Sequence, residues 1–196
     1  PVSAGDVREL LGGVRPGQQA PTVRQEARAL PVLGSYDVAV VGGGTSGAPA
    51  GIGAARAGAK TLVIEYLHGL GGVGTLGLIG KYYHGYRGGF TKEVPTGGVE
   101  AKMEWYRREL RKAGADIWFG TLGCGAFVRQ GKVGGVVVAT PHGRGVVLAK
   151  VVIDSTGNAD IAVAAGAACT YTDGSHVAVQ GAGLPPRELG AGYTNT

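Results

Sequence analysis

Short apolar runs that end at glycines alternate along the chain with stretches whose apolar residues recur at helical spacing. The run from Asp37 to Val41 stops at consecutive glycines and predicts a buried parallel strand. A helix is expected from about Ser46 to Ala57, because Gly58 follows as a stop, and residues 61–65 predict a second strand. The pattern therefore indicates a β-α-β unit, as in Rossmann-like α/β folds.

Downstream of this unit, the pattern changes from loop to helix and then to strands. Residues 66–98 are rich in glycine and aromatics without a clear period, which is typical of a long ordered loop or of short turns beside a ligand. Apolar positions at helical spacing predict a helix from about Val99 to Ala113, followed by a strand at 117–119. Three short apolar segments separated by turn residues then predict an antiparallel β meander, at 126–129, 133–139 and 146–149.

The main sheet is expected to resume with a buried parallel strand from Val151 to Asp154, followed by a small-residue helix from Ala159 to Ala167. The expected fold is thus α/β, a Rossmann-like parallel sheet with an inserted three-stranded antiparallel β meander. The boundaries that we expect are 1–34 for an N-terminal arm, 35–169 for this domain and 170–196 for an irregular tail. Within the arm, one short helix is expected near residues 22–30.

Composition and charge restrict the class of protein. The chain has 196 residues, 44% of them hydrophobic, which is enough for one domain with a substantial core. Its 39 glycines show no triplet period, so collagen is excluded. The net charge of +5 comes from scattered lysines and arginines. The densest basic cluster, from Arg107 to Lys112, is interleaved with glutamate and predicts a solvated helix face, so no nucleic-acid partner is expected.

Three further classes of feature are not expected from the sequence. Cys124 and Cys169 lie far apart, with no cysteine or histidine at ligand spacing, so we expect neither a metal site nor a redox-active cysteine pair. No apolar run approaches the roughly 20 residues that cross a membrane, so no membrane span is expected. The sequence begins at Pro1, with neither an initiator Met nor a basic-then-apolar leader, so a removed segment is possible. A cytoplasmic location is the expectation, with a removed signal peptide as the alternative.

The glycine-rich turn after the first strand is the main candidate for a binding site. Gly42, Gly44 and Gly47 have the spacing in which the first glycine permits a tight turn and the second lets backbone approach a diphosphate, while the third lets helix and strand pack closely. Thr45 and Ser46 lie between them, where N–H groups at the start of a helix can bind an anion. Such spacing arises by chance in a glycine-rich chain, so its place between strand and helix carries the prediction.

The second predicted strand ends at an acidic residue, Glu65. It lies about 20 residues beyond the glycine-rich turn, where a carboxylate can accept hydrogen bonds from both ribose hydroxyls of an adenosine. Its negative charge would repel the 2′-phosphate of NADP. The turn and Glu65 together predict a bound dinucleotide.

Three segments resemble motifs of the FAD-dependent oxidoreductases with a glutathione-reductase-like FAD-binding fold. Residues 36–47 are similar to the first motif, residues 70–75 to a Gly-Gly turn that contacts ribose and pyrophosphate, and residues 152–157 to a strand-end Thr-Gly near the adenosine. The resemblance covers about residues 36–168, in the family's order, and implies FAD as the cofactor. The expected FAD-binding residues are Gly42, Gly44, Thr45, Ser46, Gly47, Glu65, Gly71, Gly72, Thr75, Thr156 and Gly157.

Two departures from the family pattern affect these expectations. The third motif of the family commonly continues with Asp-Gly-Asp, whereas this chain has Asn158-Ala159-Asp160. Proteins of this fold also have a later segment that returns to the FAD domain and builds the flavin-ring region, and nothing after Thr170 resembles it. We therefore expect a second polypeptide, or a missing C-terminal part, to complete the flavin site.

The candidate for proton transfer is His84, in the polar and aromatic stretch from Lys81 to Arg87. By the resemblance, this stretch passes near the flavin ring, and an imidazole titrates near neutral pH. A packed or exposed histidine without a chemical role is the alternative. His68, before the Gly-Gly turn, is a further candidate for a cofactor contact or a covalent flavin link.

The function expected from these features is transfer of hydride from a C–OH or C–NH group of a small-molecule substrate to flavin. One alternative is an NAD-dependent dehydrogenase, which shares the first motif and the acidic strand end. Another is a non-catalytic FAD-binding subunit of a larger complex. The sequence does not identify the substrate or the electron acceptor.

Overall fold

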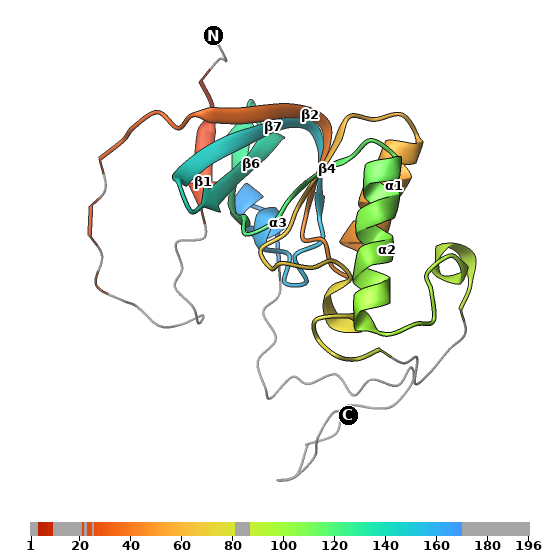
Figure 1. Ribbon diagram of the computed structural model, residues 1–196. Coiled ribbons are helices and arrows are strands. Elements are labelled where there is room, and N and C mark those ends of the chain that lie inside the picture. The colour runs from red at the N-terminus through yellow and green to blue at the C-terminus, as the bar shows by residue number, and fades with distance from the viewer. Residues whose placement is uncertain (1–3, 10–20, 22, 25, 81–86, 170–196) are drawn as a thin grey trace.

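A computed structural model describes residues 4–9, 21, 23–24, 26–80 and 87–169 of the chain. Its strands form one seven-stranded sheet in the order β1-β5-β6-β7-β2-β3-β4 (Figure 1). The sheet is parallel at one end and antiparallel at the other, and β7 belongs to both parts. This arrangement confirms the expected α/β fold with a parallel sheet and an antiparallel meander.

The parallel half of the sheet consists of four strands: β7 (Gly143–Asp154), β2 (Val32–Val41), β3 (Thr61–Ile64) and β4 (Asp116–Trp118). Val41 at the end of β2 lies opposite Ile64 of β3 and Asp154 of β7. The carboxyl ends of these three strands therefore meet at one edge of the sheet. In open α/β sheets this edge is where ligands bind.

The antiparallel half consists of β1 (Asp6–Glu9), β5 (Leu122–Arg129), β6 (Lys132–Thr140) and the first part of β7. Strands β5, β6 and β7 form the expected three-stranded meander. Strand β1, from the segment expected as an arm, pairs with β5 and adds a fourth strand at the edge. Glu9 of β1 also forms an ion pair with Arg144 of β7, so the added strand is tied to the meander by charge.

The structure corrects three local expectations. The two strands expected at 146–149 and 151–154 are one continuous strand, β7, because Lys150 between them projects to solvent and pairs with Asp37 without interrupting the backbone. Strand β2 begins at Val32, five residues before the expected start, because it pairs with β7 from Val146 onward. The helix expected near residues 22–30 is absent over 26–30, where the chain has no regular structure.

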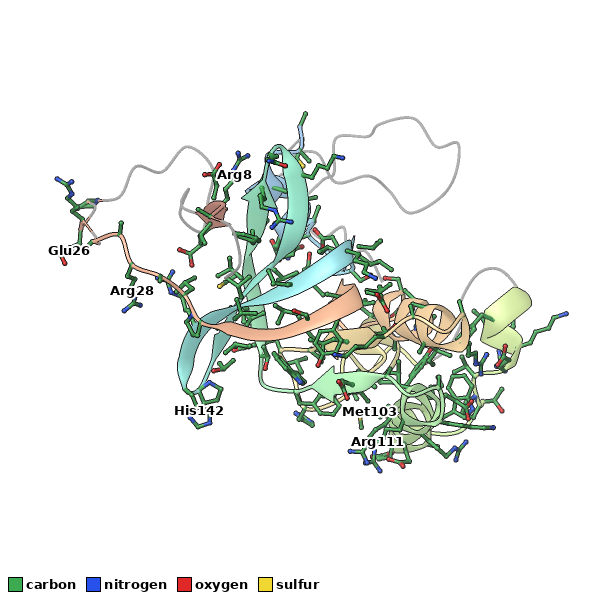
Figure 2. All side chains as sticks on the ribbon, turned by 90° about the horizontal axis from the view of Figure 1, so that it is seen from above. Arg8, Glu26, Arg28, Met103, Arg111 and His142 are labelled. Carbon is green, nitrogen blue, oxygen red and sulfur yellow. The ribbon has the colours of Figure 1, made fainter. Side chains whose placement is uncertain are left out.

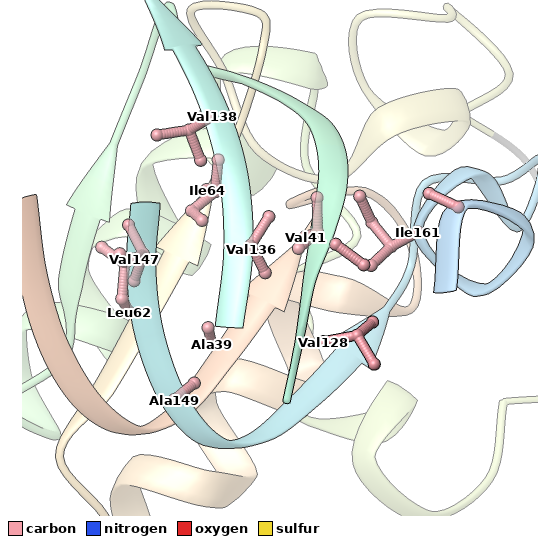
Figure 3. Packing of buried hydrophobic residues seen from close by; sticks show 12 residues of the cluster. Ala39, Val41, Leu62, Ile64, Val128, Val136, Val138, Val147, Ala149 and Ile161 are labelled. Carbon is pink, nitrogen blue, oxygen red and sulfur yellow. The ribbon is translucent and has the colours of Figure 1, made fainter. Parts of the chain in front are cut away.

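Helices α1 (Gly47–Arg56) and α2 (Val99–Lys112) lie side by side on one face of the parallel half (Figure 1). Alternate residues of β2 divide the core between the two faces, as expected for a strand. Val40 packs with α1 and α2, whereas Ala39 and Val41 pack with the meander and with α3 (Asp160–Ala165). Figure 3 shows Val41, Val136 and Ile161 converging from β2, β6 and α3.

The long segment between β3 and α2 contains two short 3-10 helices, η1 (Gly72–Gly74) and η2 (Gly89–Lys92). Over residues 66–80 and 87–98, this agrees with the expected loop with short turns. Within the part of the chain that the structure describes, no helix is long and apolar enough to cross a membrane. The same residues contain no group of His, Cys, Asp and Glu side chains that could hold a metal ion.

Candidate functional site

Three turns meet at the edge where the strands β2, β3 and β7 end. We call them the phosphate turn (residues 42–47), the second turn (70–75) and the third turn (154–160). The N–H of Gly71 donates to the carbonyl of Gly43 over 2.9 Å, and the Thr45 hydroxyl donates to the carbonyl of Gly71 over 3.0 Å. The N–H of Ser155 donates to the carbonyl of Val41 over 2.8 Å. The three motifs that are separate in sequence therefore form one site.

Two glycines of the phosphate turn are required by the local backbone. Gly42 has a φ of +90°, and a Cβ there would lie 2.3 Å from the carbonyl oxygen of Ser155. A Cβ at Gly47 would lie 1.7 Å from the carbonyl oxygen of Gly42, which no side chain can occupy. Both positions therefore allow strand, turn and helix to approach closely, and their contact with a cofactor remains a prediction.

The surroundings of Gly44 are different. A Cβ at this position would meet only the Cα of Gly72, at an ordinary contact distance of 3.8 Å. The backbone N–H groups of Gly44, Thr45, Ser46 and Gly47 have no acceptor among the described residues. Unpaired N–H groups at the start of a helix, next to open space, are suited to bind an anion.

The second turn packs directly on the phosphate turn. Gly71 and Gly72 have φ angles of +97° and +53°, and a Cβ on Gly72 would lie 2.9 Å from the Cα of Gly44. Thr75 is buried, and its hydroxyl donates to the carbonyl of Leu70 over 2.6 Å. Its side chain thus closes the turn on itself, a structural task that the sequence did not reveal. A contact between Thr75 and a cofactor remains a prediction.

Glu65 braces the phosphate turn from the end of β3. Only 8% of the residue is exposed. Its Oε2 accepts a hydrogen bond from the N–H of Gly43 over 2.7 Å, and its Oε1 accepts one from the N–H of Leu67, also over 2.7 Å. A carboxylate has about four acceptor positions, so capacity for ribose hydroxyls remains. These hydrogen bonds to Glu65, and the role of Gly43 as a donor, were not expected from the sequence.

The third turn is organised by hydrogen bonds to Asp154, a role that the sequence did not reveal. Its Oδ1 accepts hydrogen bonds from the N–H and the hydroxyl of Thr156, over 3.1 and 2.8 Å. Its Oδ2 accepts one from the N–H of Ala162 in α3 over 2.8 Å. Asp154 ends β7 as Glu65 follows β3, so an acidic residue at a strand end was the available signal. Gly157 follows with a φ of +90°, whereas Asn158 is exposed.

A cavity of about 560 Å³ adjoins the phosphate turn on the side of the second turn. Thr45, Gly71 and Thr75 line it on the side of these turns. Its lining also includes residues from the segment before α2 and from α2 itself: Arg87, Thr91, Val94, Pro95, Thr96, Lys102 and Tyr106. A ligand bound in the phosphate turn can therefore extend into the cavity.

The two histidine candidates have different outcomes. His84 lies outside the described residues, so its role remains a prediction. The residues that flank the segment 81–86, Gly80 and Arg87, line the cavity. His68 is exposed and lines a separate hollow of about 320 Å³, together with Glu100 and Met103 of α2. His142, at the turn between β6 and β7, is exposed and far from the site (Figure 2).

Arg56 of α1 connects the segment around η2, which lines part of the cavity, to the helices α1 and α2. Its guanidinium donates to Glu93 over 2.9 Å and to Glu109 of α2 over 3.1 Å. The same group lies over the ring of Phe90, 5.7 Å from the ring centre. Arg56 thus links the helix that starts at the phosphate turn with this segment of the cavity lining.

Comparisons with known structures agree with this arrangement. The chain is similar to a geranylgeranyl bacteriochlorophyll reductase-like protein from Thermoplasma acidophilum, with 23% identity and a TM-score of 0.52, over 74% of this chain and 43% of that one. It is also similar to THI4 from Thermovibrio ammonificans, with 22% identity and a TM-score of 0.50, over 66% of this chain and 61% of that one. At this identity the likenesses establish the fold alone. The chain spans about half the length of these structures.

A comparison with curated proteins found no match. A family model described as FAD dependent oxidoreductase matches residues 37–108 and 90–184. These ranges include all three turns and the meander, and they confirm FAD as the cofactor that the sequence implied. The cradle of unpaired N–H groups at the phosphate turn fits the diphosphate of that cofactor. The chain therefore belongs to the FAD dependent oxidoreductase family.

Proposed function

We propose that this chain forms the FAD-binding part of an oxidoreductase that moves hydride from a C–OH or C–NH group of a small molecule to flavin. One observation carries the proposal: four consecutive backbone N–H groups without a described acceptor stand beside the open space at Gly44. A diphosphate bound there satisfies these donors. The N-terminal end of α1 adds a favourable dipole for its negative charge.

The neighbouring residues divide the remaining tasks. Glu65 accepts hydrogen bonds from the adenosine ribose, using the lone pairs that Gly43 and Leu67 leave free. The cavity that begins at Thr45 and Gly71 receives the flavin end and the substrate. When bound, FAD supplies the hydride-accepting ring. The residues of the chain hold, orient and shield the reactants.

Removal of hydride from an alcohol or amine also requires removal of a proton from its oxygen or nitrogen. We assign this proton to an imidazole nitrogen of His84, because Gly80 and Arg87 on either side of residues 81–86 line the cavity. Imidazole gains and loses a proton near neutral pH, so it can act as the base without a large perturbation.

A second polypeptide, or a further part of the same polypeptide, is proposed to complete the substrate region. The relatives with solved structures are longer, since the matched part is 43% of one chain and 61% of the other. Several apolar side chains close to the second turn in sequence and outside the cavity lining are also exposed, among them Tyr66, Leu67 and Leu78. Membership of the FAD family argues against the alternative of an NAD-dependent dehydrogenase.

Native mass spectrometry of the protein purified from its source tests both parts of this proposal. We expect a mass increment equal to FAD on this chain, and a second chain or a longer polypeptide in the same particle. The intact particle is then mixed without oxygen with panels of alcohols and amines, and the flavin absorbance is followed. Bleaching by at least one substrate is expected. A particle that retains FAD and is bleached by none would instead be a non-catalytic FAD-binding subunit.

A further inference from the structure

The cavity beside the phosphate turn carries two positive side chains and, among its described lining residues, no carboxylate. The cations are Arg87, before η2, and Lys102, in α2. Both side chains are partly buried. A charge in a partly enclosed site is screened less than one on an open surface, so the pair makes the cavity electrostatically positive.

The partners of these two cations are neutral. Arg87 Nε donates to the carbonyl of Thr91 over 3.0 Å, and its Nη2 donates to the carbonyls of Thr91 and Val94. Lys102 Nζ donates to the carbonyl of Gly80 over 2.7 Å. Neither cation forms an ion pair with a described carboxylate, unlike Arg56 outside the cavity. The carbonyls orient the two groups without neutralising their charge.

Both cations also keep donors for a ligand. A guanidinium has five N–H groups and an ammonium has three, and only some of them are used by the carbonyls. The other lining residues include apolar side chains, namely Val73, Ile79, Val94 and Pro95. A complementary ligand therefore has an anionic end and a small apolar body.

We propose that the substrate of this site is an organic anion, with a carboxylate or phosphate ester that binds Arg87 and Lys102 and an apolar body beside Val73 and Ile79. This inference rests on the proposed function, because the substrate must lie next to the flavin end of FAD. The diphosphate of FAD is assigned to the N–H groups of the phosphate turn, so the two cations are available to a second anion.

Titration of the FAD-loaded protein with three related compounds tests this inference. Benzoate and phenyl phosphate carry the proposed charge, and benzamide is a neutral analogue of benzoate. Binding is followed by the perturbation of the flavin absorbance spectrum and by the shift in unfolding temperature. At least one anion is expected to bind about tenfold more tightly than benzamide, and less tightly as NaCl is raised. The tighter of the two identifies the anionic group. Equal affinity for benzamide and both anions overturns the inference.

Matched variants locate the charge. Arg87→Gln and Lys102→Gln are each expected to weaken anion binding about tenfold and to leave benzamide binding unchanged. Arg111→Gln and Lys112→Gln remove the same charges from exposed positions of α2 outside the cavity, and they should leave anion binding unchanged (Figure 2). If the control variants weaken anion binding equally, the effect is general surface charge and the inference is wrong.

Two further measurements keep the outcomes separate. Arg87→Lys keeps the charge while losing the forked contacts to Thr91 and Val94, so recovery of anion binding relative to Arg87→Gln identifies charge rather than loop support. FAD content is measured for every variant. A wild-type protein that cannot hold FAD overturns the proposed function and this inference with it. A protein that holds FAD without preferring anions overturns this inference alone.

Discussion

In the parallel half of the sheet, glycines cluster in the turns that follow β2 and β3, whereas in the antiparallel half Gly125 and Gly135 lie inside strands. A Cβ at Gly125 in β5 would lie 2.4 Å from the carbonyl oxygen of Arg8, and one at Gly135 in β6 would lie 2.3 Å from that of Val147. These glycines make room for a neighbouring strand. Gly44 makes room for nothing in the chain itself. At Gly44 this open space adjoins backbone N–H groups that have no acceptor among the described residues, and the two features together mark the candidate site.

The same contrast applies to the carboxylates at the ends of strands. Glu65, which follows β3, accepts hydrogen bonds from the N–H of Gly43 in the phosphate turn and from the N–H of Leu67. Glu9 in β1 pairs with Arg144 of β7, which ties this edge strand to the meander. The first carboxylate shapes a site and the second fastens an edge strand. Substitutions in the two halves should thus separate cofactor binding from folding.

The largest effect is expected for Gly47→Ala at the start of α1. Its Cβ would lie 1.7 Å from the carbonyl oxygen of Gly42, so the helix and the phosphate turn must separate, at a cost of about 3 kcal/mol. Urea unfolding measures this change. Gly53→Ala in the same helix is the control: nothing lies within 4 Å of its Cβ, and we expect a gain of roughly 0.5–1 kcal/mol. Equal stability of the two variants would contradict the close contact.

The next largest effect is expected for Gly135→Ala in the meander. The new methyl group would meet the carbonyl oxygen of Val147 and strain the pairing of β6 with β7, costing about 2 kcal/mol. The folded fraction should still bind FAD, because β6 does not contribute to the three turns. Equilibrium unfolding and the FAD content per folded chain are the two measurements. Loss of FAD from a fully folded variant would show that the two halves are coupled.

A smaller loss of stability is expected for Glu65→Gln. The amide replaces one acceptor oxygen by an NH₂ group, which cannot accept from Gly43 or Leu67, so one buried N–H loses its partner at a cost of about 1–2 kcal/mol. FAD affinity should fall as well, because the brace holds the phosphate turn. Glu104→Gln, at an exposed position of α2, is the control. Unchanged unfolding and FAD affinity in Glu65→Gln would show that the brace has no effect.

The smallest effect is expected for Tyr36→Phe, far from the turns. Burial, together with the hydrogen bond and the negative charge of Asp116, raises the pKa of Tyr36 from 10.0 to about 12. Because the folded-state pKa is the higher one, the stabilisation is complete below pH 10 and is lost as the pH rises through about 12. Between pH 9 and 12, the free energy of unfolding should therefore fall less steeply with pH for Tyr36→Phe than for the wild-type protein. Parallel curves would contradict the raised pKa.

Much of the fold follows from local signals in the sequence. The runs ending at Val41 and Ile64 are apolar and bounded by turns, so strands β2 and β3 and the helix between them could be predicted. The three motifs lie together because β2, β3 and β7 pair in parallel, which brings their carboxyl ends to one edge of the sheet. The family match then confirmed FAD.

The missed features depend on contacts between distant residues. Strand β1 is four residues long, three of them charged, and only its pairing with β5 makes it a strand. The roles of Glu65 and Thr75 depend on which backbone groups surround them, and residue type alone does not show this. Short-range patterns therefore locate the site, whereas its internal hydrogen bonds require the folded chain.

The central claim is that a diphosphate lies against the backbone N–H groups beside Gly44. Gly44→Val tests it most directly, because the position has no positive φ and its first side-chain atom meets only an ordinary contact in the chain. Gly44→Ala serves as the milder variant, and both are compared by circular dichroism, urea unfolding and FAD content. We expect Gly44→Val to remain folded and to lose its FAD. A folded Gly44→Val protein that stays fully loaded with FAD would contradict the placement of the diphosphate.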